Sequence, residues 1–346
     1  MMQKPDFIWY SPTQAPFVLE GFPYYKEEGL YRRLSAAPPF TLPEGVESLA
    51  WCTSGGQIRF RATFRTMRVK VCCAPATESD HMTSINRGGF DLYLGKEGTP
   101  RYYSSTRFTR GTDRYESAMA EFEEPQTFEC VLNFPLYRGV QTVLIGFDAD
   151  AVVEAPAARA IEAPVVVYGT SITQGGCCSR PGMVYTNILS RRLNVPFVNL
   201  GFSGSGRSEP EVAYEVRRIK ASLFIHDAEA NAVNLETMQQ NYPAFIRIYR
   251  EANPDTPYLV VSKAPYAKEL LQPTYYDLRI KMKAFQKNLV EKLQAEGDHN
   301  IWFLDGEDLY PDFFEENTVD GVHATDLGFW MMAENLEPVV KKLLGL

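Results

Sequence analysis

The feature that most constrains the fold is a regular alternation of apolar and amphipathic segments between residues 163 and 309. Five apolar runs rich in β-branched and aromatic residues occur there. The segments between them place apolar residues at i, i+3 and i+4, the period of a helix with one buried face. Strand–helix repetition of this kind predicts a five-stranded parallel sheet with helices on both faces. The expected strands are residues 163–169, 195–202, 221–228, 256–265 and 300–309, and the expected helices are residues 183–193, 211–219, 235–252 and 275–296.

The first half of the chain has a different pattern, in which short β-rich runs are separated by turns rich in Gly, Pro, Asp and Ser. The runs are residues 55–64, 67–73, 89–95, 127–135 and 139–149. They predict an antiparallel β-sandwich in which each sheet has one solvent-facing side. An Ala- and Pro-rich stretch at residues 154–164 lies between the two patterns. We therefore expect two domains, residues 1–156 and residues 157–346.

The charge of the chain favours a small, neutral ligand. The formal net charge is −8, and no run rich in Lys or Arg is present. Neither nucleic acid nor a membrane is therefore expected as a partner. No stretch approaches the ~18 apolar residues that span a bilayer, and no basic, apolar leader is visible. These features predict a cytoplasmic protein. Secretion would require that a leader had been removed, and the oligomeric state stays open.

The cysteines and histidines lack the spacing of a disulfide framework or a metal site. Four of the six cysteines form the adjacent pairs Cys72–Cys73 and Cys177–Cys178, and no C-x-x-C occurs. Reduced thiols are expected, with the second pair as small buried residues. The four histidines are scattered, so we expect neither a metal nor another cofactor. They are His81, His226, His299 and His323.

Ser171 is the candidate nucleophile. It follows the apolar run "VVVYG" and a single residue, Thr170. A sharp turn at Gly169 would present the serine at the carboxyl edge of the parallel sheet, where open α/β folds bind ligands. The structural alternative is that Thr170 or Ser171 only caps the following helix.

A serine hydroxyl needs a base to take its proton, and histidine has a suitable pKa. Asp320 precedes His323 by three residues, in a loop before the last amphipathic segment. At that spacing the carboxylate can hold the ring Nδ1–H while Nε2 faces the serine. His226 beside Asp227 is a rival pair at the same edge. We rank it lower, because a histidine directly at a strand end is more commonly packed or hydrogen-bonded.

Acyl transfer also requires donors for the developing oxyanion. Gly204 can offer a backbone N–H, Ser171 its own N–H, and Asn231 a side-chain amide. A turn glycine and a helix cap are the structural alternatives for Gly204 and Asn231.

Together these residues resemble the SGNH (GDSL-like) hydrolase superfamily, named for its Ser, Gly, Asn and His. The similarity lies in four blocks in the family's order, "GTSITQGG", "NLGFSGSG", "DAEAN" and "DGVH". It implies a three-layer α/β/α, flavodoxin-like domain. It also implies Ser171 as the nucleophile, His323 and Asp320 as the rest of a triad, and Gly204 and Asn231 as oxyanion donors. Two departures are present: Gly-Thr-Ser replaces Gly-Asp-Ser, and no acid follows Asn231. The second departure leaves Asn234 as the alternative asparagine.

The first half resembles a jelly-roll-like β-sandwich module that precedes certain SGNH esterases, through the Gly-x-Asp-Leu-Tyr signature at residues 89–93. A related arrangement occurs in carbohydrate esterases that remove acetyl groups from sugars. The resemblance therefore implies a serine esterase that removes a small acyl group, acetyl, from a carbohydrate or similar polyol without a cofactor. Tyr266, Tyr275 and Tyr276 follow the fourth expected strand and are candidates for stacking on the sugar, with core or helix packing as the alternative.

Two other functions fit the same features. Acyl transfer to a sugar or another hydroxyl acceptor would use the same residues with a different acceptor. From a different class, a non-catalytic carbohydrate-binding protein would retain the hydrolase fold as an inactive scaffold. The complete set of Ser, Asp and His argues against that second alternative. A long-chain lipase or thioesterase is disfavoured because no extended apolar lid is evident.

Overall fold

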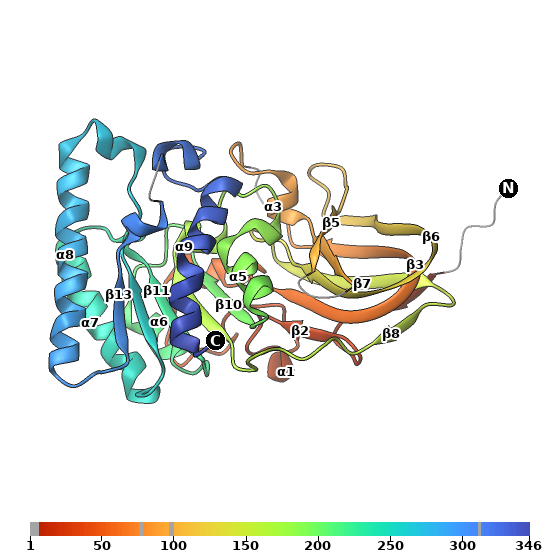
Figure 1. Cartoon of the computed structure of the whole chain (residues 1–346), viewed down its shortest axis with the longest axis horizontal. Coiled ribbons are helices and arrows are strands. Elements are labelled where there is room, and N and C mark those ends of the chain that lie inside the picture. Colours follow the sequence, from red (N-terminus) through yellow and green to blue (C-terminus); the bar gives the residue numbers. More distant parts are fainter. Residues whose placement is uncertain (1–6, 76–78, 97–99, 311–312) are drawn as a thin grey trace.

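The structure, a computed structural model, describes residues 7–75, 79–96, 100–310 and 313–346. Two units lie side by side along the longest axis of the molecule (Figure 1). The first contains an antiparallel sheet, and the second contains a parallel sheet flanked by helices. The fold class predicted from the sequence is therefore confirmed. The exact boundary near residue 156 stays a prediction.

The parallel sheet has five strands, each within one of the five apolar runs. They are β9 (Val165–Gly169), β10 (Phe197–Gly201), β11 (Leu223–Asp227), β12 (Tyr258–Val261) and β13 (Ile301–Leu304). Their order in the sheet is β10-β9-β11-β12-β13, which is the doubly wound order 2-1-3-4-5. In such sheets ligands bind outside the carboxyl ends of the first and third strands, where the winding reverses. Here those ends belong to β9 and β11.

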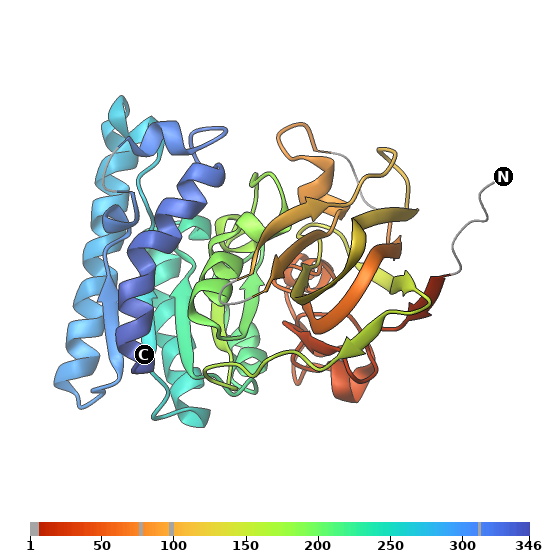
Figure 2. The ribbon, with the colours of Figure 1, turned by 45° about the vertical axis from the view of Figure 1, so that its right-hand side comes forward.

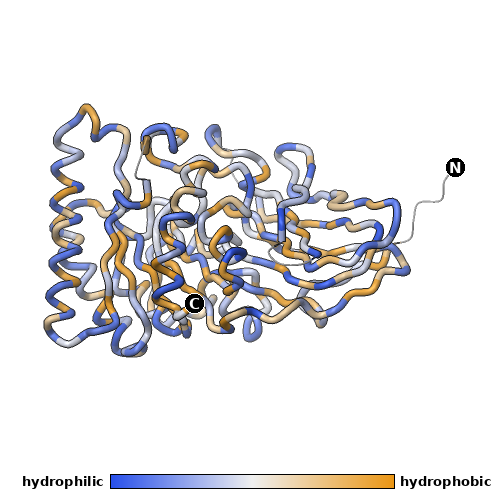
Figure 3. Tube along the Cα trace, in the orientation of Figure 1, coloured by the Kyte–Doolittle hydropathy of each residue, from blue (hydrophilic) through white to orange (hydrophobic). Residues whose placement is uncertain are grey.

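Helices cover both faces of this sheet. Because side chains alternate along a strand, Val166 and Tyr168 of β9 pack with one set of helices and Val165 and Val167 with the other. The first set is α6 (Pro210–Val216), α7 (Leu235–Ala252) and α8 (Pro273–Ala295), and the second is α5 (Tyr185–Leu193) and α9 (Asp326–Leu344). Figure 3 shows long apolar stretches along the inner strands, whereas the outer helix α8 alternates between polar and apolar residues. This agrees with the amphipathic pattern of the sequence.

The first unit is an eight-stranded antiparallel sheet in which β3 and β6 are the longest strands. Figure 2, turned by 45°, shows these strands curving around the core of the unit. The strands are β1 (Phe7–Tyr10), β2 (Val18–Glu20), β3 (Gln57–Cys73), β4 (Asp91–Gly95), β5 (Arg101–Ser105), β6 (Arg114–Asn133), β7 (Val140–Asp148) and β8 (Val152–Glu154).

Four short helices lie outside the two helix layers. Three belong to the first unit, α1 (Tyr25–Glu28), α2 (Glu44–Leu49) and α3 (Ser84–Gly88), and α4 (Ser171–Gln174) belongs to the second.

Strand β3 joins two runs that the sequence pattern keeps separate. Up to Phe64 the side chains of β3 that belong to the hydrophobic core are at even positions, and from Met67 onward they are at odd positions. The register against β6 breaks between Phe64 and Thr66, where one residue of β3 stands against residues 122–125 of β6, and such an irregularity can turn the following side chains to the other face. Both halves of β3 therefore face one core.

The segment before β3 packs against the second unit. Leu34, Val46 and Ala50 are buried in the same cluster as the strands and helices of the parallel sheet. The guanidinium of Arg33 donates to the carbonyls of Asn199 and Gly201 in β10, at 3.1 Å for Asn199 and 2.6 Å for Gly201. The outer edge of the parallel sheet is thus closed by residues from the first half of the chain.

All six cysteines are free, as expected. Within the described ranges, no helix has the length and apolarity needed to cross a membrane.

Candidate active site

The turn after β9 places Ser171 at the carboxyl edge of the parallel sheet. A Cβ at Gly169 would overlap Thr173 and the carbonyl of Asp227, so only glycine fits at the end of this strand. Thr170 has extended backbone angles and accepts a hydrogen bond from Ile172 N, which makes it the N-cap of α4. Ser171 is the first residue of that helix, so its N–H has no partner within the helix. Thr170 therefore caps the helix, and the hydroxyl of Ser171 is not used for capping.

Ser171, His323 and Asp320 are joined by hydrogen bonds. Ser171 Oγ lies 2.8 Å from Nε2 of His323, and Nδ1 of the same ring lies 2.7 Å from Oδ2 of Asp320. The serine is 7% exposed, whereas the carboxylate of Asp320 is more open to solvent. Donation from Nδ1 to the carboxylate leaves the lone pair of Nε2 directed at the hydroxyl. This is the geometry in which a histidine can remove the proton of a serine.

A tight turn before α9 holds the histidine and the aspartate. Thr318 and Ala324 form a β-bridge, and Val319 N donates to the carbonyl of His323 at 2.8 Å. Asp320 Oδ1 accepts the backbone N–H groups of Val322 and His323. Partial burial acts to raise the pKa of Asp320, but the hydrogen bonds from His323 outweigh it and hold that pKa below the usual value. The carboxylate therefore stays ionised beside the imidazole.

The loop after β10 lies next to the nucleophile turn, and the segment after β11 is bonded to that loop. Phe202 N donates to the carbonyl of Gly169, and Asn231 Nδ2 donates to the carbonyl of Phe202 at 3.1 Å. Gly204 has φ +69, and its backbone N–H has no partner within the part of the chain described. Asn231, at the end of the 3₁₀ turn η2 (Glu229–Asn231), keeps its second amide hydrogen for another acceptor.

Asn234, the alternative asparagine, has a different environment. It is exposed, and its Oδ1 accepts the N–H of Thr237 at 2.8 Å as the N-cap of α7. Of the two asparagines, only Asn231 is bonded to the glycine loop.

His226 and Asp227, the rival pair, face opposite sides of β11. His226 is fully buried, with Nε2 2.8 Å from Ser208 Oγ and Nδ1 2.8 Å from the Tyr258 hydroxyl. Burial lowers its pKa to about 3. The carboxylate of Asp227 accepts from Thr173 and Tyr185 instead. The two side chains therefore do not form a dyad, and this histidine stays neutral within the core.

The three tyrosines lie in two places. Tyr266 is partly buried under the ammonium of Lys263, and the next residue, Ala267, donates its N–H to the carbonyl of Gly321 in the turn that holds Asp320. Tyr275 and Tyr276 are 43% and 48% exposed on the first turns of α8. Their contact with a substrate stays a prediction.

The first unit also contacts the nucleophile turn, through residues that the sequence did not single out. The Tyr137 hydroxyl donates to the carbonyl of Ser171 at 3.2 Å. Ser54 Oγ donates to the carbonyl of Gln174, and Asn86 Nδ2 donates to the carbonyl of Gly175. The carbonyls of Ser171, Gln174 and Gly175 thus accept hydrogen bonds from side chains of the β-sandwich. No local signal marks these three residues, because each depends on how the two units are docked.

Comparison with known families agrees with this fold. Residues 162–341 match the model of the GDSL-like lipase/acylhydrolase family, and residues 7–153 match the model of the N-terminus of esterases of the SGNH hydrolase type. Together the fold and these matches define an SGNH-type hydrolase with an amino-terminal β-sandwich. The first match covers more than half of the chain, and the chain belongs to the GDSL-like lipase/acylhydrolase family. No sequence among curated proteins matches it.

Several solved structures share the whole architecture. A protein described as a GDSL-like lipase from Bacteroides ovatus is 27% identical with a TM-score of 0.90, over 98% of each chain. A salicylyl-acyltransferase from a tetracycline biosynthetic pathway is 18% identical with a TM-score of 0.74, over 97% of each chain. A family two carbohydrate esterase from Cellvibrio japonicus is 11% identical with a TM-score of 0.63, over 99% of each chain. The last two likenesses concern the fold alone.

Proposed function

We propose that this protein is a serine esterase that removes a small acyl group, acetyl, from a carbohydrate or similar polyol. The observation that carries the proposal is the continuous hydrogen-bonded chain from Ser171 through His323 to Asp320, at the edge of the sheet where the winding reverses. Gly204 and Asn231 lie on the neighbouring loops and supply donors.

In the first step, Ser171 Oγ attacks the ester carbonyl carbon while Nε2 of His323 takes the hydroxyl proton. The N–H groups of Ser171 and Gly204 and the amide of Asn231 would stabilise the charge on the carbonyl oxygen. Collapse of the tetrahedral intermediate breaks the bond to the leaving alcohol, which receives the proton from the imidazolium. Asp320 stabilises that imidazolium and keeps the ring oriented.

In the second step, water attacks the acyl-serine with His323 again acting as the base. The acid is released, and the proton returns to Ser171. No group outside this set is required for the balance of atoms and protons.

A shared fold and one aromatic side chain favour a carbohydrate as the substrate. Two family two carbohydrate esterases and an acetyl xylan esterase from Butyrivibrio proteoclasticus share the two-unit fold over nearly the whole chain, at 11–13% identity. The partly buried Tyr266 next to the Asp320 turn offers an aromatic surface for a sugar ring.

The test is hydrolysis of p-nitrophenyl acetate, butyrate and octanoate by the wild type and by Ser171→Ala and His323→Ala. We expect acetate to be the best of the three esters, and each variant to lose at least about three orders of magnitude in kcat. Ser48→Ala and His299→Ala, both at exposed positions, are the matched controls and should keep the wild-type rate. Undiminished hydrolysis by Ser171→Ala would overturn the proposal. Acetylated xylan and acetylated cello-oligosaccharides then test the carbohydrate part.

A second candidate is acyl transfer to a hydroxyl acceptor, favoured by the likeness to the salicylyl-acyltransferase, whose TM-score is higher than those of the carbohydrate esterases. The two reactions share the acyl-enzyme and differ in what attacks it. Product analysis with p-nitrophenyl acetate and a polyol acceptor separates them: an acetylated polyol in excess of free acetate would indicate transfer.

A further inference from the structure

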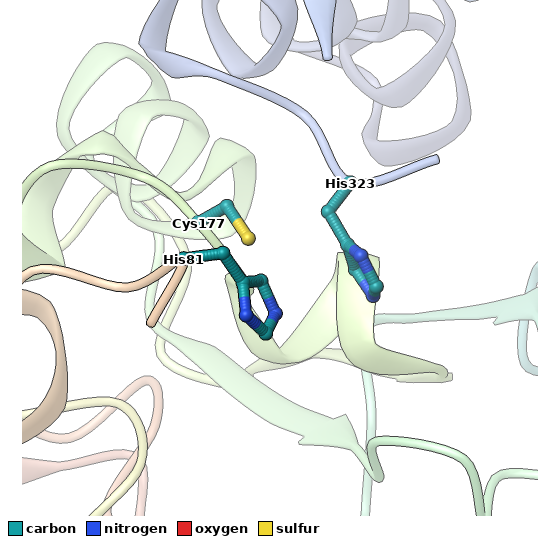
Figure 4. A group of neighbouring side chains, drawn as sticks. All are labelled: His81, Cys177 and His323. Atoms are coloured by element: carbon teal, nitrogen blue, oxygen red, sulfur yellow. The ribbon is translucent and has the colours of Figure 1, made fainter. Parts of the chain in front are cut away.

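Three side chains that could bind a metal ion meet beside the candidate nucleophile. They are His81 from the loop before α3, Cys177 from the loop after α4, and His323. One ligand atom of each lies within 4.8 Å of the other two, and Figure 4 shows the three side chains directed toward a common space. The rings of the two histidines are 5.9 Å apart. One ligand therefore comes from the β-sandwich and two from the hydrolase unit.

Each of the two histidines has an aspartate carboxylate beside its Nδ1. Nδ1 of His81 lies 2.9 Å from a carboxylate oxygen of Asp80, as Nδ1 of His323 lies 2.7 Å from Asp320. With Nδ1 donating to a carboxylate, each ring has its lone pair on Nε2. Histidines that bind metal ions commonly have this carboxylate behind them, because it fixes the tautomer and makes the ligand more basic.

Cys177 provides the third ligand. It is 8% exposed, and its thiol has no hydrogen-bond partner among the described residues. Its backbone has φ +76, a left-handed conformation that is strained for a residue with a Cβ and that persists mainly at functional sites. Burial, with the nearby Asp320, raises the pKa of the thiol to about 12. Without a metal ion the sulfur is therefore a neutral thiol.

We propose that His81, Cys177 and His323 form a binding site for a thiophilic divalent ion such as Zn²⁺, and that its occupancy inhibits the enzyme. Two imidazole nitrogens and one thiolate, with water as the fourth ligand, suit tetrahedral Zn²⁺. Ligand atoms around such an ion are about 3.3 to 3.6 Å apart, so the side chains need to close by about 1 Å. The Cys177 proton passes to solvent on binding.

Inhibition follows from the single lone pair on Nε2 of His323. That lone pair can accept the proton of Ser171 or bind the ion, but it cannot do both. The inhibition therefore rests on the proposed function, whereas the metal site itself does not.

The metal site is tested with Co²⁺, whose bond to a thiolate gives a charge-transfer absorption band. We expect this band in the wild type and in Ser171→Ala, which lacks the nucleophile but keeps all three ligands. Cys177→Ser should lose the band, and Cys72→Ser, a buried cysteine of the β-sandwich, should retain it. A band of unchanged intensity in Cys177→Ser would overturn the site.

The inhibition is tested by titrating Zn²⁺ against p-nitrophenyl acetate hydrolysis, each variant being normalised to its own metal-free rate. The wild type should be inhibited and should recover with a chelator. In Cys177→Ser and in His81→Asn, half-inhibition should require at least about tenfold more Zn²⁺. His299→Asn is the control for an exposed histidine. Equal inhibition of the wild type and both variants would overturn the proposal.

The two readouts separate the proposals. If the wild type has no esterase activity, the proposed function is refuted. If the same wild type shows a thiolate–Co²⁺ band that Cys177→Ser lacks, the metal site is supported. If Cys177→Ser fails to fold, His81→Asn on its exposed loop provides the same test, through loss of Co²⁺ affinity.

Discussion

At the scale of single residues, two histidines of the hydrolase unit show how environment decides a role. His226 lies in the core between Ser208 and Tyr258, where burial depresses its pKa to about 3. His323 lies at the sheet edge between a serine and an ionised aspartate. Only the second faces both a hydroxyl that can give up its proton and a carboxylate that can stabilise the resulting imidazolium.

The amide of Asn231 is proposed to donate to the oxyanion, so its removal should slow the chemical step. We predict that Asn231→Ala lowers kcat for p-nitrophenyl acetate by about 10²- to 10³-fold, the usual cost of one oxyanion donor. Steady-state kinetics provide the measurement. A loss below about threefold would show that this asparagine only anchors the Phe202 carbonyl.

The burial of Glu229 should make the free energy of unfolding depend on pH. Its buried carboxylate accepts from Lys263 N and Gln286 Nε2, and burial raises its pKa to about 7. A raised pKa means that the folded state binds more protons than the unfolded state between about pH 4.5 and 7. The stabilisation is therefore complete below the unfolded pKa and is lost as the pH rises through about 7.

The variant Glu229→Gln removes this titration while keeping the size of the side chain. From pH 5 to pH 8, the free energy of unfolding of the wild type should fall by about 2 to 3 kcal/mol relative to the variant. Urea unfolding of both proteins at four pH values gives this difference. A difference that does not change with pH would contradict the raised pKa.

At the scale of elements, the start of α7 separates stability from activity. Asn234 caps this helix through the N–H of Thr237. Asn234→Ala should lower the free energy of unfolding by about 1 kcal/mol and leave kcat unchanged. Urea unfolding and kinetics on the same preparation test both parts. If Asn234→Ala lost much of its kcat and Asn231→Ala did not, Asn234 and not Asn231 would be the oxyanion donor.

The sequence predicted the elements of the hydrolase unit well, because each strand is a short apolar run and each helix has one apolar face. The serine, histidine and aspartate that the sequence singled out lie within hydrogen-bond distance of one another, and their catalytic role stays a prediction. It did less well in the β-sandwich. The first half of β6, from Arg114 to Gln126, was not expected to be a strand, and β3 was divided at the point where the register shifts. A bulge changes the alternation on which strand prediction depends.

At the scale of the whole molecule, the docking of the two units was beyond the reach of sequence patterns. The bonds from Tyr137, Ser54 and Asn86 to the nucleophile turn all run between the β-sandwich and the hydrolase unit. The contact between the rings of His81 and His323 also joins the β-sandwich to the hydrolase unit. Such contacts depend on the relative placement of surfaces, which leaves no periodic trace in the chain.

Arg33 should be the residue on which this docking depends most. Its guanidinium is buried, stacks over Phe202 and donates to carbonyls of Leu49, Asn199 and Gly201. We predict that Arg33→Met lowers the free energy of unfolding by about 3 kcal/mol, because buried carbonyls lose their donors. Arg61→Met, a half-exposed arginine of β3, should cost less than about 1 kcal/mol. Equal effects of the two variants in urea unfolding would contradict this.

The same arginine has a consequence for synthesis on the ribosome. Two of the three carbonyls that receive its guanidinium, those of Asn199 and Gly201, are 166 and 168 residues further along the chain. At the usual rate of translation, they emerge roughly 10 to 30 seconds after it. Leu34, Val46 and Ala50 likewise stay uncovered until the strands of the parallel sheet that pack on them are synthesised. The first part of the nascent chain therefore carries a cation that lacks two of its three carbonyl partners, and an uncovered apolar surface, until β10 is made.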